Sequence, residues 1–267
     1  MRLAVPEGIG LARRDGSAVI AVVNCGHTGR IGAYAEMAAG AGMASIITGG
    51  GQRERWRQVA PHGGAEPKLP TNPWAFGFPG TADGPVVADF ATGMISGGAT
   101  FRTAKEGRRL PDRYVLRADG VPTDDPNVYL KGGAIRPFAG PKGYGMGLIT
   151  SLLSTALLEH DTVEGNWIIF LLDTSAYRSP DAIEAMAAEV VDDLRSTVPA
   201  PGFDRVEIPG QREHRLMLHR RGTGIPIHPA VWKDLEDLHA RLVSGSADPD
   251  TPRRSPDPAG GDAAAES

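Results

Sequence analysis

The sequence predicts an α/β protein in which helices flank a mixed β-sheet. Short apolar runs rich in β-branched residues alternate with segments whose apolar residues recur at helical spacing. The alternation is irregular, without the even repeat of a barrel, and no internal repeat is visible. The 35 glycines and 22 prolines indicate abundant turns and loops between these elements.

The first predicted elements are a strand, a loop, a helix and a second strand. Residues 18–23, A-V-I-A-V-V, form an apolar run flanked by glycines, which suits a strand covered on both faces. A helix follows and stops at Gly42, and residues 43–48 return to a strand. The apolar positions of this helix are Ile31, Tyr34, Ala38 and Ala41. Two further strands are predicted at 71–79 and 85–92, joined by the turn signal A-D-G.

The second half of the chain predicts more helix than strand. A short helix is expected at 101–107, and residues 110–126, dense in Pro, Asp and Gly, are expected to form an ordered irregular loop. Apolar stripes predict helices through 146–157 and 180–197. Residues 166–173 and 205–208 are predicted strands, and Pro229 opens a final helix. The apolar side of that helix carries Val231, Leu235, Leu238 and Leu242.

Composition limits the organisation and the partners of the chain. Residues 1–243 are expected to form one domain, whereas residues 244–267 have almost nothing to bury and are expected to be a disordered tail. With 28 Lys and Arg against 32 Asp and Glu, the chain has no basic footprint for nucleic acid. No apolar segment is long enough for a membrane span, and the N-terminus lacks the features of a signal peptide. The single cysteine, Cys25, excludes an internal disulfide or a Cys-x-x-Cys metal site, so we expect a cytoplasmic protein without a metal.

His27 is the main candidate for catalysis. It lies in N-C-G-H-T-G-R-I-G (24–32), between the first predicted strand and the first helix, where Gly26 and Gly29 leave room for a ligand. Imidazole can gain or lose a proton near neutral pH, as proton transfer to a hydroxyl or carbonyl requires. From spacing alone, a structural loop histidine is the alternative. Cys25 is either a nucleophile or, as we expect, a small buried thiol.

Charged residues at helix starts and strand ends suggest an anion site. Lys142 lies among glycines just before a helix, where free N–H groups attract a phosphate, although a solvated lysine is the alternative. Arg30 opposes the dipole of the first helix, which favours an external anion. Asp89 could bind a ribose hydroxyl, orient an imidazole or cap the next segment. Neither G-x-G-x-x-G after the first strand nor a P-loop is present, so a nucleotide would be held in another way.

Five motifs follow one another along the chain. They are N-C-G-H-T-G-R-I-G-A-Y-A-E-M-A-A, T-N-P-W-A-F-G-F-P, V-V-A-D-F-A-T-G, L-P-D-R-Y-V-L-R-A-D-G-V-P-T-D-D-P and G-P-K-G-Y-G-M-G-L-I. In this order they resemble the malate/L-lactate dehydrogenase family of the second type, and H-x-G-R-I-G is most similar to its hydroxycarboxylate dehydrogenase branch. The resemblance extends from the first residues to about Leu242.

The resemblance implies a non-Rossmann fold and a homodimer. It also implies NAD or NADP as cofactor, and a small 2-hydroxy acid, 2-oxo acid or cyclic imine as substrate. His27 matches the catalytic histidine of the family, which gives a proton to the substrate or takes one from it. The positions that match cofactor contacts are Arg30, Ile31, Gly51, Asp89, Phe90, Ala91, Thr92 and Lys142.

Departures from the family pattern leave a second interpretation open. Family members usually carry an additional N-terminal helical segment with a Ser-His-Gly motif and an arginine for the substrate carboxylate, and the residues before Ala18 leave no room for it. Position 28 is Thr28 where a bulky apolar residue is usual, and residues 49–51 are G-G-G. The alternative is therefore a truncated, inactive paralogue that keeps the fold and perhaps dinucleotide binding. Whether Met1 is the true start of the protein is open. The motifs favour neither NAD nor NADP and name no particular acid.

Overall fold

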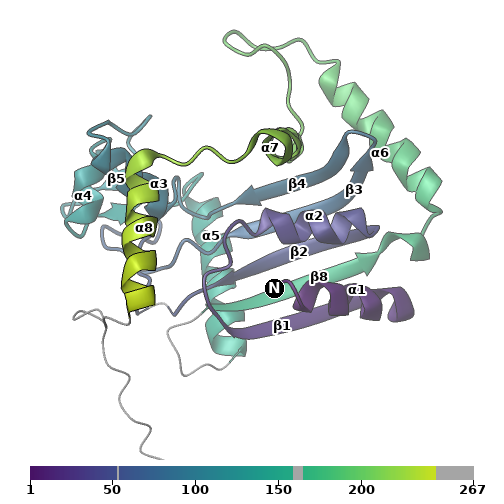
Figure 1. Ribbon diagram of the computed structural model, residues 1–267, viewed down its shortest axis with the longest axis horizontal. Helices are drawn as coiled ribbons and strands as arrows, with labels where there is room; N and C mark the ends of the chain where they lie inside the picture. The colour runs from purple at the N-terminus through teal and green to yellow at the C-terminus, as the bar shows by residue number, and fades with distance from the viewer. Residues whose placement is uncertain (53, 159–164, 245–267) are drawn as a thin grey trace, which may run out of the picture. The chain divides into compact units, whose positions relative to one another are not determined.

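The computed structural model describes residues 1–52, 54–158 and 165–244 (Figure 1). The chain divides into two units, residues 1–216 and 217–267. The first unit is built on a five-stranded sheet. In spatial order its strands are β1 (Ser17–Cys25), β8 (Gly165–Asp173), β2 (Met43–Gly50), β3 (Trp74–Thr81) and β4 (Gly84–Phe90). A smaller sheet has the order β6 (Pro122–Thr123), β5 (Val115–Leu116) and β7 (Ala134–Ile135).

Helices flank the large sheet. Those of the first unit are α1 (Ala4–Asp15), α2 (Gly32–Gly40), α3 (Gly97–Lys105), α4 (Pro126–Leu130), α5 (Pro141–Ser151) and α6 (Pro180–Arg195), with a π-helical turn η1 (Leu152–Leu157) and a 3-10 turn η2 (Thr174–Ala176). α1 and α2 lie on the same face of the large sheet (Figure 1). α5 and η1 contact β2 and β8, and α6 contacts β3.

The predicted strand–loop–helix–strand unit forms, but its two strands are not neighbours. β1 and β2 run in the same direction, and β8 lies between them, hydrogen bonded antiparallel to both. The remaining pairs, β2–β3 and β3–β4, are antiparallel as well. Every pair of neighbouring strands in the large sheet is thus antiparallel, whereas a mixed sheet was expected. The reason is that β8, a strand from later in the chain, pairs with both β1 and β2 and separates these two parallel strands. The predicted α/β class, the flanking helices and the non-Rossmann topology are confirmed.

The main core lies between the sheet, α1 and α2. Alternate strand residues point toward it, so Ile47 and Ile169 are fully buried beside Ala35 and Ala38 of α2. Gly77 of β3 permits this close approach, since a Cβ there would lie 2.6 Å from the carbonyl oxygen of Ala35. The burial of this apolar surface holds α2, and with it the loop that precedes α2, against the sheet.

α1 is a helix that the sequence did not predict. Pro6 and Gly8 are poor helix formers, and the segment is too short to be stable alone. Val5 and Ala12 are fully buried against the sheet, and Gly16, with a φ of 85°, ends the helix in the left-handed conformation. Tertiary packing therefore outweighs the weak local preference.

The strand predicted at 205–208 was wrong. The segment has no regular structure, and beside β4 the Pro209 carbonyl accepts one hydrogen bond from Val87 N (3.0 Å). Pro209 and Gly210 (φ 91°) interrupt any longer ladder. α7 (Gln211–Thr223) follows directly.

Two other segments are more ordered than expected. Residues 110–126, predicted as a loop, contain β5 and β6, whose two-residue strands are too short to show a period of two. α3 begins at Gly97 rather than 101, because the Ser96 hydroxyl accepts a hydrogen bond from Ala99 N (3.2 Å) and caps the helix. The helix predicted from Pro180 is confirmed as α6.

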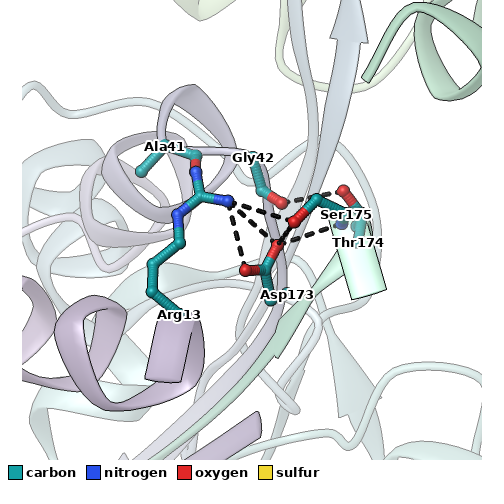
Figure 2. A network of polar contacts seen from close by, with 6 residues as sticks. All are labelled: Arg13, Ala41, Gly42, Asp173, Thr174 and Ser175. Atoms are coloured by element: carbon teal, nitrogen blue, oxygen red, sulfur yellow. Dashed lines mark hydrogen bonds and ion pairs between the residues drawn. The ribbon is translucent and has the colours of Figure 1, made fainter. Parts of the chain in front are cut away.

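Arg13, in the last turn of α1, joins three elements (Figure 2). Its Nη1 donates to both carboxylate oxygens of Asp173 at the end of β8 (3.0 and 3.1 Å), and its Nη2 donates to the carbonyl of Ala41 in the α2–β2 turn. The backbone N–H and the hydroxyl of Ser175 also donate to Asp173 (3.0 and 2.7 Å). Burial acts to raise the pKa of Asp173, but the hydrogen bonds from Ser175 and the charge of Arg13 outweigh it and hold the pKa below its ordinary value.

The face of the sheet opposite α1 and α2 is only partly covered. α5 packs over one end of it, where the hydroxyls of Thr48 and Thr150 lie 2.9 Å apart. The rest of this face, named here the open sheet face, borders an apolar cavity of about 580 Å³ without a charged lining residue. Its large apolar side chains are Val19, Ile46, Phe76, Phe78, Val86, Phe170 and Leu172.

The second unit is described as far as residue 244. It contains the end of α7 and α8 (Pro229–Ser244), the final helix predicted from Pro229. Within α8, Trp232 Nε1 donates to Glu236 Oε1 (2.7 Å). Residues 245–267 of the predicted tail lie outside the described ranges. None of the described helices is both long enough and apolar enough to cross a lipid bilayer.

Candidate functional site

A cavity of about 600 Å³ opens at one end of the large sheet. Because neighbouring strands are antiparallel, the ends of β1, β2 and β4 meet the starts of β3 and β8 at this edge. Its volume is typical of a small-molecule site. The lining residues are 25–31, 50–51, 70–73 and 89–91, together with Trp56, Gln58, Ser96, Gly165 and Trp167.

His27 lines this cavity from the loop between β1 and α2. Its Nδ1 accepts a hydrogen bond from Gly29 N (3.0 Å), so in the neutral ring the proton is carried by Nε2. The loop itself is held to α2, since the Tyr34 hydroxyl donates to the carbonyl of Thr28 (3.0 Å). The exposed imidazole is thus oriented by its own backbone and carries an N–H donor.

The start of α2 borders the cavity through Arg30 and Ile31. Ile31 is buried in the main core and fixes the position of the helix start. Arg30 was predicted to favour an external anion, but its guanidinium pairs with Glu36 (2.8 Å) and lies 3.7 Å from the carboxylate of Asp89. The positive charge of Arg30, which opposes the dipole of α2, is therefore balanced by the carboxylates of Glu36 and Asp89.

Asp89, at the end of β4, caps the first turn of α2. Its Oδ2 accepts a hydrogen bond from Gly32 N (2.8 Å). The capping alternative expected Asp89 to cap the segment that follows it, whereas Asp89 caps a helix from earlier in the chain. Burial raises the pKa of Asp89, the Gly32 hydrogen bond and Arg30 act to lower it, and Glu213 and Glu36 act to raise it. The net effect is a pKa above the ordinary aspartate value.

Backbone and apolar groups form the walls on either side of β3. At the end of β2, Gly51 has no space for a side chain, because a Cβ would collide with the ring of Trp56. At the end of β4, Phe90 and Ala91 line the cavity. The Phe90 ring stacks on Phe76 with centroids 6.1 Å apart, which contributes an apolar wall.

Two predicted cofactor contacts do not line the cavity. Thr92 is buried, and its hydroxyl donates to the carbonyl of Thr71 (2.9 Å). Lys142 is exposed in the first turn of α5. A ligand that reached Lys142 would therefore extend beyond the cavity, and its predicted role stays a prediction.

Two lining residues, Asn72 and Trp167, were missed in the sequence. Asn72 is fully buried with a φ of 39°, and its Nδ2 donates to Gly147 O (2.6 Å) and the Ser151 hydroxyl (2.8 Å). The Asn-Pro pair in T-N-P (71–73) could have marked it, because asparagine tolerates the left-handed conformation. Nothing local distinguishes Trp167 from an ordinary core residue of a buried strand.

Cys25 ends β1 and lines the cavity, partly buried and packed against the main core. It is more accessible than the buried thiol that was expected. Within the described ranges, no group of three or more His, Cys, Asp or Glu side chains is arranged to hold a metal ion. The polar side chains that border the cavity carry an imidazole, a guanidinium, a carboxylate, a thiol, amides, hydroxyls and indoles.

Fold and site together define an α/β protein with a small-molecule cavity, bordered by a histidine, a helix start and the glycine-rich end of a strand. A family model described as malate/L-lactate dehydrogenase matches residues 1–236. The chain therefore belongs to the malate/L-lactate dehydrogenase family, as the five sequence motifs predicted.

Named relatives show the same class. The chain is 33% identical over 243 residues to an L-lactate dehydrogenase of Cupriavidus necator, which covers 86% of this chain and 69% of that protein. It is 28% identical to the ureidoglycolate dehydrogenase (NAD(+)) of Escherichia coli, over 91% of this chain and 70% of the relative. The solved structure of sulfolactate dehydrogenase from Methanocaldococcus jannaschii matches with a TM-score of 0.77 at 27% identity, over 90% and 71% of the two chains. Family and relatives identify a dehydrogenase-type oxidoreductase.

Proposed function

We propose that the protein is an NAD(P)-dependent oxidoreductase that interconverts a small 2-hydroxy acid and its 2-oxo acid. His27 is its proton donor and acceptor. The observation that carries the proposal is the position of His27, held by its own loop in a cavity beside a helix start and bare glycine backbone. The relatives named as lactate and ureidoglycolate dehydrogenases support this reaction class.

The residues around the cavity fit a nicotinamide dinucleotide. Gly50 and Gly51 at the end of β2 add backbone groups to the lining, and the Phe90 and Ala91 wall offers apolar surface to a flat ring. When bound, the nicotinamide supplies or accepts the hydride. The proposed contacts are Arg30, Ile31, Gly51, Asp89, Phe90 and Ala91, with Thr92 behind the wall and Lys142 at the start of α5.

The role of His27 follows from the chemistry of its ring. To give a proton to a carbonyl oxygen and end neutral, the ring has to be doubly protonated first. A protonated Nδ1 no longer accepts the hydrogen bond from Gly29 N, so this contact opens when the ring is charged. After the transfer, the exposed ring exchanges with solvent and returns to the tautomer that the loop favours.

The test is the oxidation of NADH and NADPH by the full chain with a panel of small 2-oxo acids. His27→Asn should lower kcat by about 10²- to 10⁴-fold, the usual contribution of a general acid–base group. Its Kd for NADH, measured by calorimetry, should stay within about twofold of the wild-type value. His62→Asn is the matched control, because His62 is exposed and lies outside this cavity.

The outcomes separate the enzyme from its alternative. Turnover that depends on His27 and not on His62 supports the proposal, and the preferred acid and cofactor follow from the panel. Wild-type chain that binds NADH without turnover of any 2-oxo acid would support the inactive paralogue instead. A cytoplasmic location, favoured by the single cysteine, is part of this proposal.

We further propose a homodimer in which a second copy covers the open sheet face. Five strands about 4.8 Å apart and roughly eight residues long make a sheet face of about 600 Å² before side chains are counted. α5 and η1 cover one end of it, so the open sheet face is smaller than this. A standard stable interface takes ~800 Å² from each partner, so the proposed interface would also include side chains around the open sheet face. The face is apolar and has no charged lining residue, and contiguous apolar surface of this kind often marks an interaction site.

A further inference from the structure

β1 contains a bulge just before the loop that carries His27. Val22 and Cys25 are three residues apart in β1, but their partners in β8 are only two residues apart. Residues 23 and 24 therefore lie opposite a single residue, Asn166. Bulges bend the strand that contains them, and they are frequent at sheet edges and beside active sites. β1 is an edge strand, and the chain joins the cavity lining at Cys25, directly after the bulge.

The side-chain amide of Asn166 joins this bulge to the end of η1. Its Oδ1 accepts a hydrogen bond from Asn24 N (3.0 Å). Its Nδ2 donates to the carbonyls of Ser154 (2.9 Å) and Leu158 (3.1 Å). A flipped amide would place Oδ1 against two carbonyls and Nδ2 against an N–H, so these contacts allow one orientation. Asn166 is fully buried and does not line the cavity.

This amide stabilises the backbone conformation of the bulge. Asn24 has a φ of 52°, in the left-handed region, and the extra residue of a bulge is left unpaired by the ladder. Asn166 Oδ1 supplies the missing acceptor. Without the bulge, the register of β1 would change by one residue. Such a change moves the chain by about 3.3 Å and turns each side chain to the other face of the sheet.

The other end of the His27 loop is held by α2. The Tyr34 hydroxyl donates to the carbonyl of Thr28 (3.0 Å), and Ile31 is buried in the main core. His27 therefore lies between an anchor in α2 and the anchor at Asn24. Displacing a catalytic group by about 1 Å can cost about 10²-fold in rate, so a shift of one residue at the Asn24 anchor is large on this scale.

We propose that Asn166 is a positioning residue for His27. It acts through the backbone of Asn24, because it keeps the bulge from which the loop enters the cavity wall. η1 takes part, since its terminal carbonyls fix the amide that holds Asn24. The inference rests on the proposed function, because it assigns Asn166 a role in the reaction of His27.

Cys25 reports the state of the bulge without any turnover. It is the only cysteine of the chain, and it is partly buried directly after the bulge. Asn166→Leu keeps a similar side-chain volume and removes all three hydrogen bonds of the amide. The reaction of Cys25 with iodoacetamide, followed by mass spectrometry, should become about tenfold faster in this variant, because the segment opens more often.

The same variant should separate kcat from cofactor binding. With the full chain and the 2-oxo acid that the wild type prefers, kcat should fall about 10- to 10²-fold. The Kd for NADH should stay within about threefold of the wild-type value, because Ile31 and the Asp89 cap hold the start of α2 independently.

Thr150→Val is the matched control. Thr150 of α5 is also fully buried, and its hydroxyl makes hydrogen bonds to the Thr48 hydroxyl (2.9 Å) and the Met146 carbonyl (3.0 Å). Its loss should lower the Tm by an amount similar to that of Asn166→Leu, since both remove buried hydrogen bonds. The kcat and the rate of Cys25 modification should stay within about twofold of the wild-type values.

Asn24→Val tests the bulge from its other side. A β-branched residue strongly disfavours a φ of 52°, so this variant should show the same changes in kcat and in Cys25 modification while the Asn166 amide is intact. If Asn166→Leu does not fold, Asn24→Val decides the question.

Each other result has a defined meaning. If the wild-type chain turns over no 2-oxo acid, the proposed function fails, and the Cys25 rates alone decide whether Asn166 holds the loop. The positioning role is overturned if Cys25 reacts at the wild-type rate in Asn166→Leu, or if kcat falls no further than in Thr150→Val. A Kd for NADH that weakens as much as kcat falls would also overturn it, because the whole site would then be disturbed.

Discussion

Asp89 is a carboxylate with acidic as well as basic neighbours. Its side chain is 20% exposed, and Arg30 lies 3.7 Å away, while Glu36 and Glu213 add negative charge nearby. Burial and these two carboxylates raise its pKa in the folded chain, against the opposing effects of Gly32 N and Arg30. The folded state therefore binds the Asp89 proton more tightly than the unfolded state does.

Asp89→Asn should raise the Tm at neutral pH. Below the ordinary aspartate pKa of 3.8 both states are protonated, and wild type and variant should be equally stable. As the pH rises through the higher folded pKa, only the wild type has to bury a charge, and it loses stability. Asparagine keeps an oxygen for Gly32 N. Thermal unfolding from pH 3 to 8 checks this, and a wild type more stable than the variant at pH 8 would contradict it.

Among the elements, α1 depends most clearly on contacts far away in the chain. Its packing on the sheet is supplemented at the C-terminal end by Arg13, which contacts Asp173 of β8 and the carbonyl of Ala41 (Figure 2). The carboxylate of Asp173 also accepts two hydrogen bonds from Ser175. This network closes the end of the sheet opposite the cavity and joins α1, β8 and the α2–β2 turn.

Asp173→Asn should lower the Tm at pH 7 by about 3–6 °C, as expected for the loss of one or two charge-assisted hydrogen bonds in a domain of this length. The pKa of Asp173 is depressed in the folded chain, so its stabilisation is present above 3.8 and is lost as the pH falls through the lower folded value. The difference between wild type and variant should therefore shrink below pH 4. Thermal unfolding at several pH values measures it.

Asp15→Asn is the control for this experiment. Asp15 also pairs with an arginine of α1, Arg14, but both side chains are exposed. Exposed pairs contribute little, so the Tm of this variant should stay close to the wild-type value. Equal effects of the two substitutions would argue against a structural role for the Arg13 network.

At the scale of the whole molecule, helices cover one face of the large sheet and leave much of the other face exposed. α1 and α2 bury the closed face, whereas the open sheet face keeps Phe78 and Phe170 41% and 37% exposed. An isologous pairing would bring the same patch of two copies together and remove both from water. The proposed homodimer is thus a consequence of helices distributed unevenly over one sheet.

Phe170→Glu should convert the dimer into a monomer. A charge in the centre of an apolar interface is strongly disfavoured, while a partly exposed position in the isolated chain accepts it. Size-exclusion chromatography with light scattering measures the mass. Phe101→Glu, at an exposed phenylalanine of α3 away from this face, should remain dimeric. A monomeric wild-type chain would disprove the proposed interface.

Much of the site was predictable where its residues follow one another in the chain. His27, Arg30 and Ile31 occupy one loop and one helix start, and Asp89 to Ala91 follow one strand, so local patterns and ordered motifs locate them. Lys142 was predicted by the same logic, yet it lies outside the cavity lining. A glycine-flanked lysine marks a helix start, but not the direction in which that helix faces.

The sequence by itself determined the α/β class, the family and the strand-to-helix placement of His27, because these depend on local periodicity and on motifs in order. Only the tertiary structure decided that β8 lies between β1 and β2 and that α1 is a helix. It alone brought Asn72 and Trp167 to one strand end from opposite faces of the sheet. These features depend on contacts between distant segments, whose free energy comes from packing and hydrogen bonding that no short stretch of sequence contains.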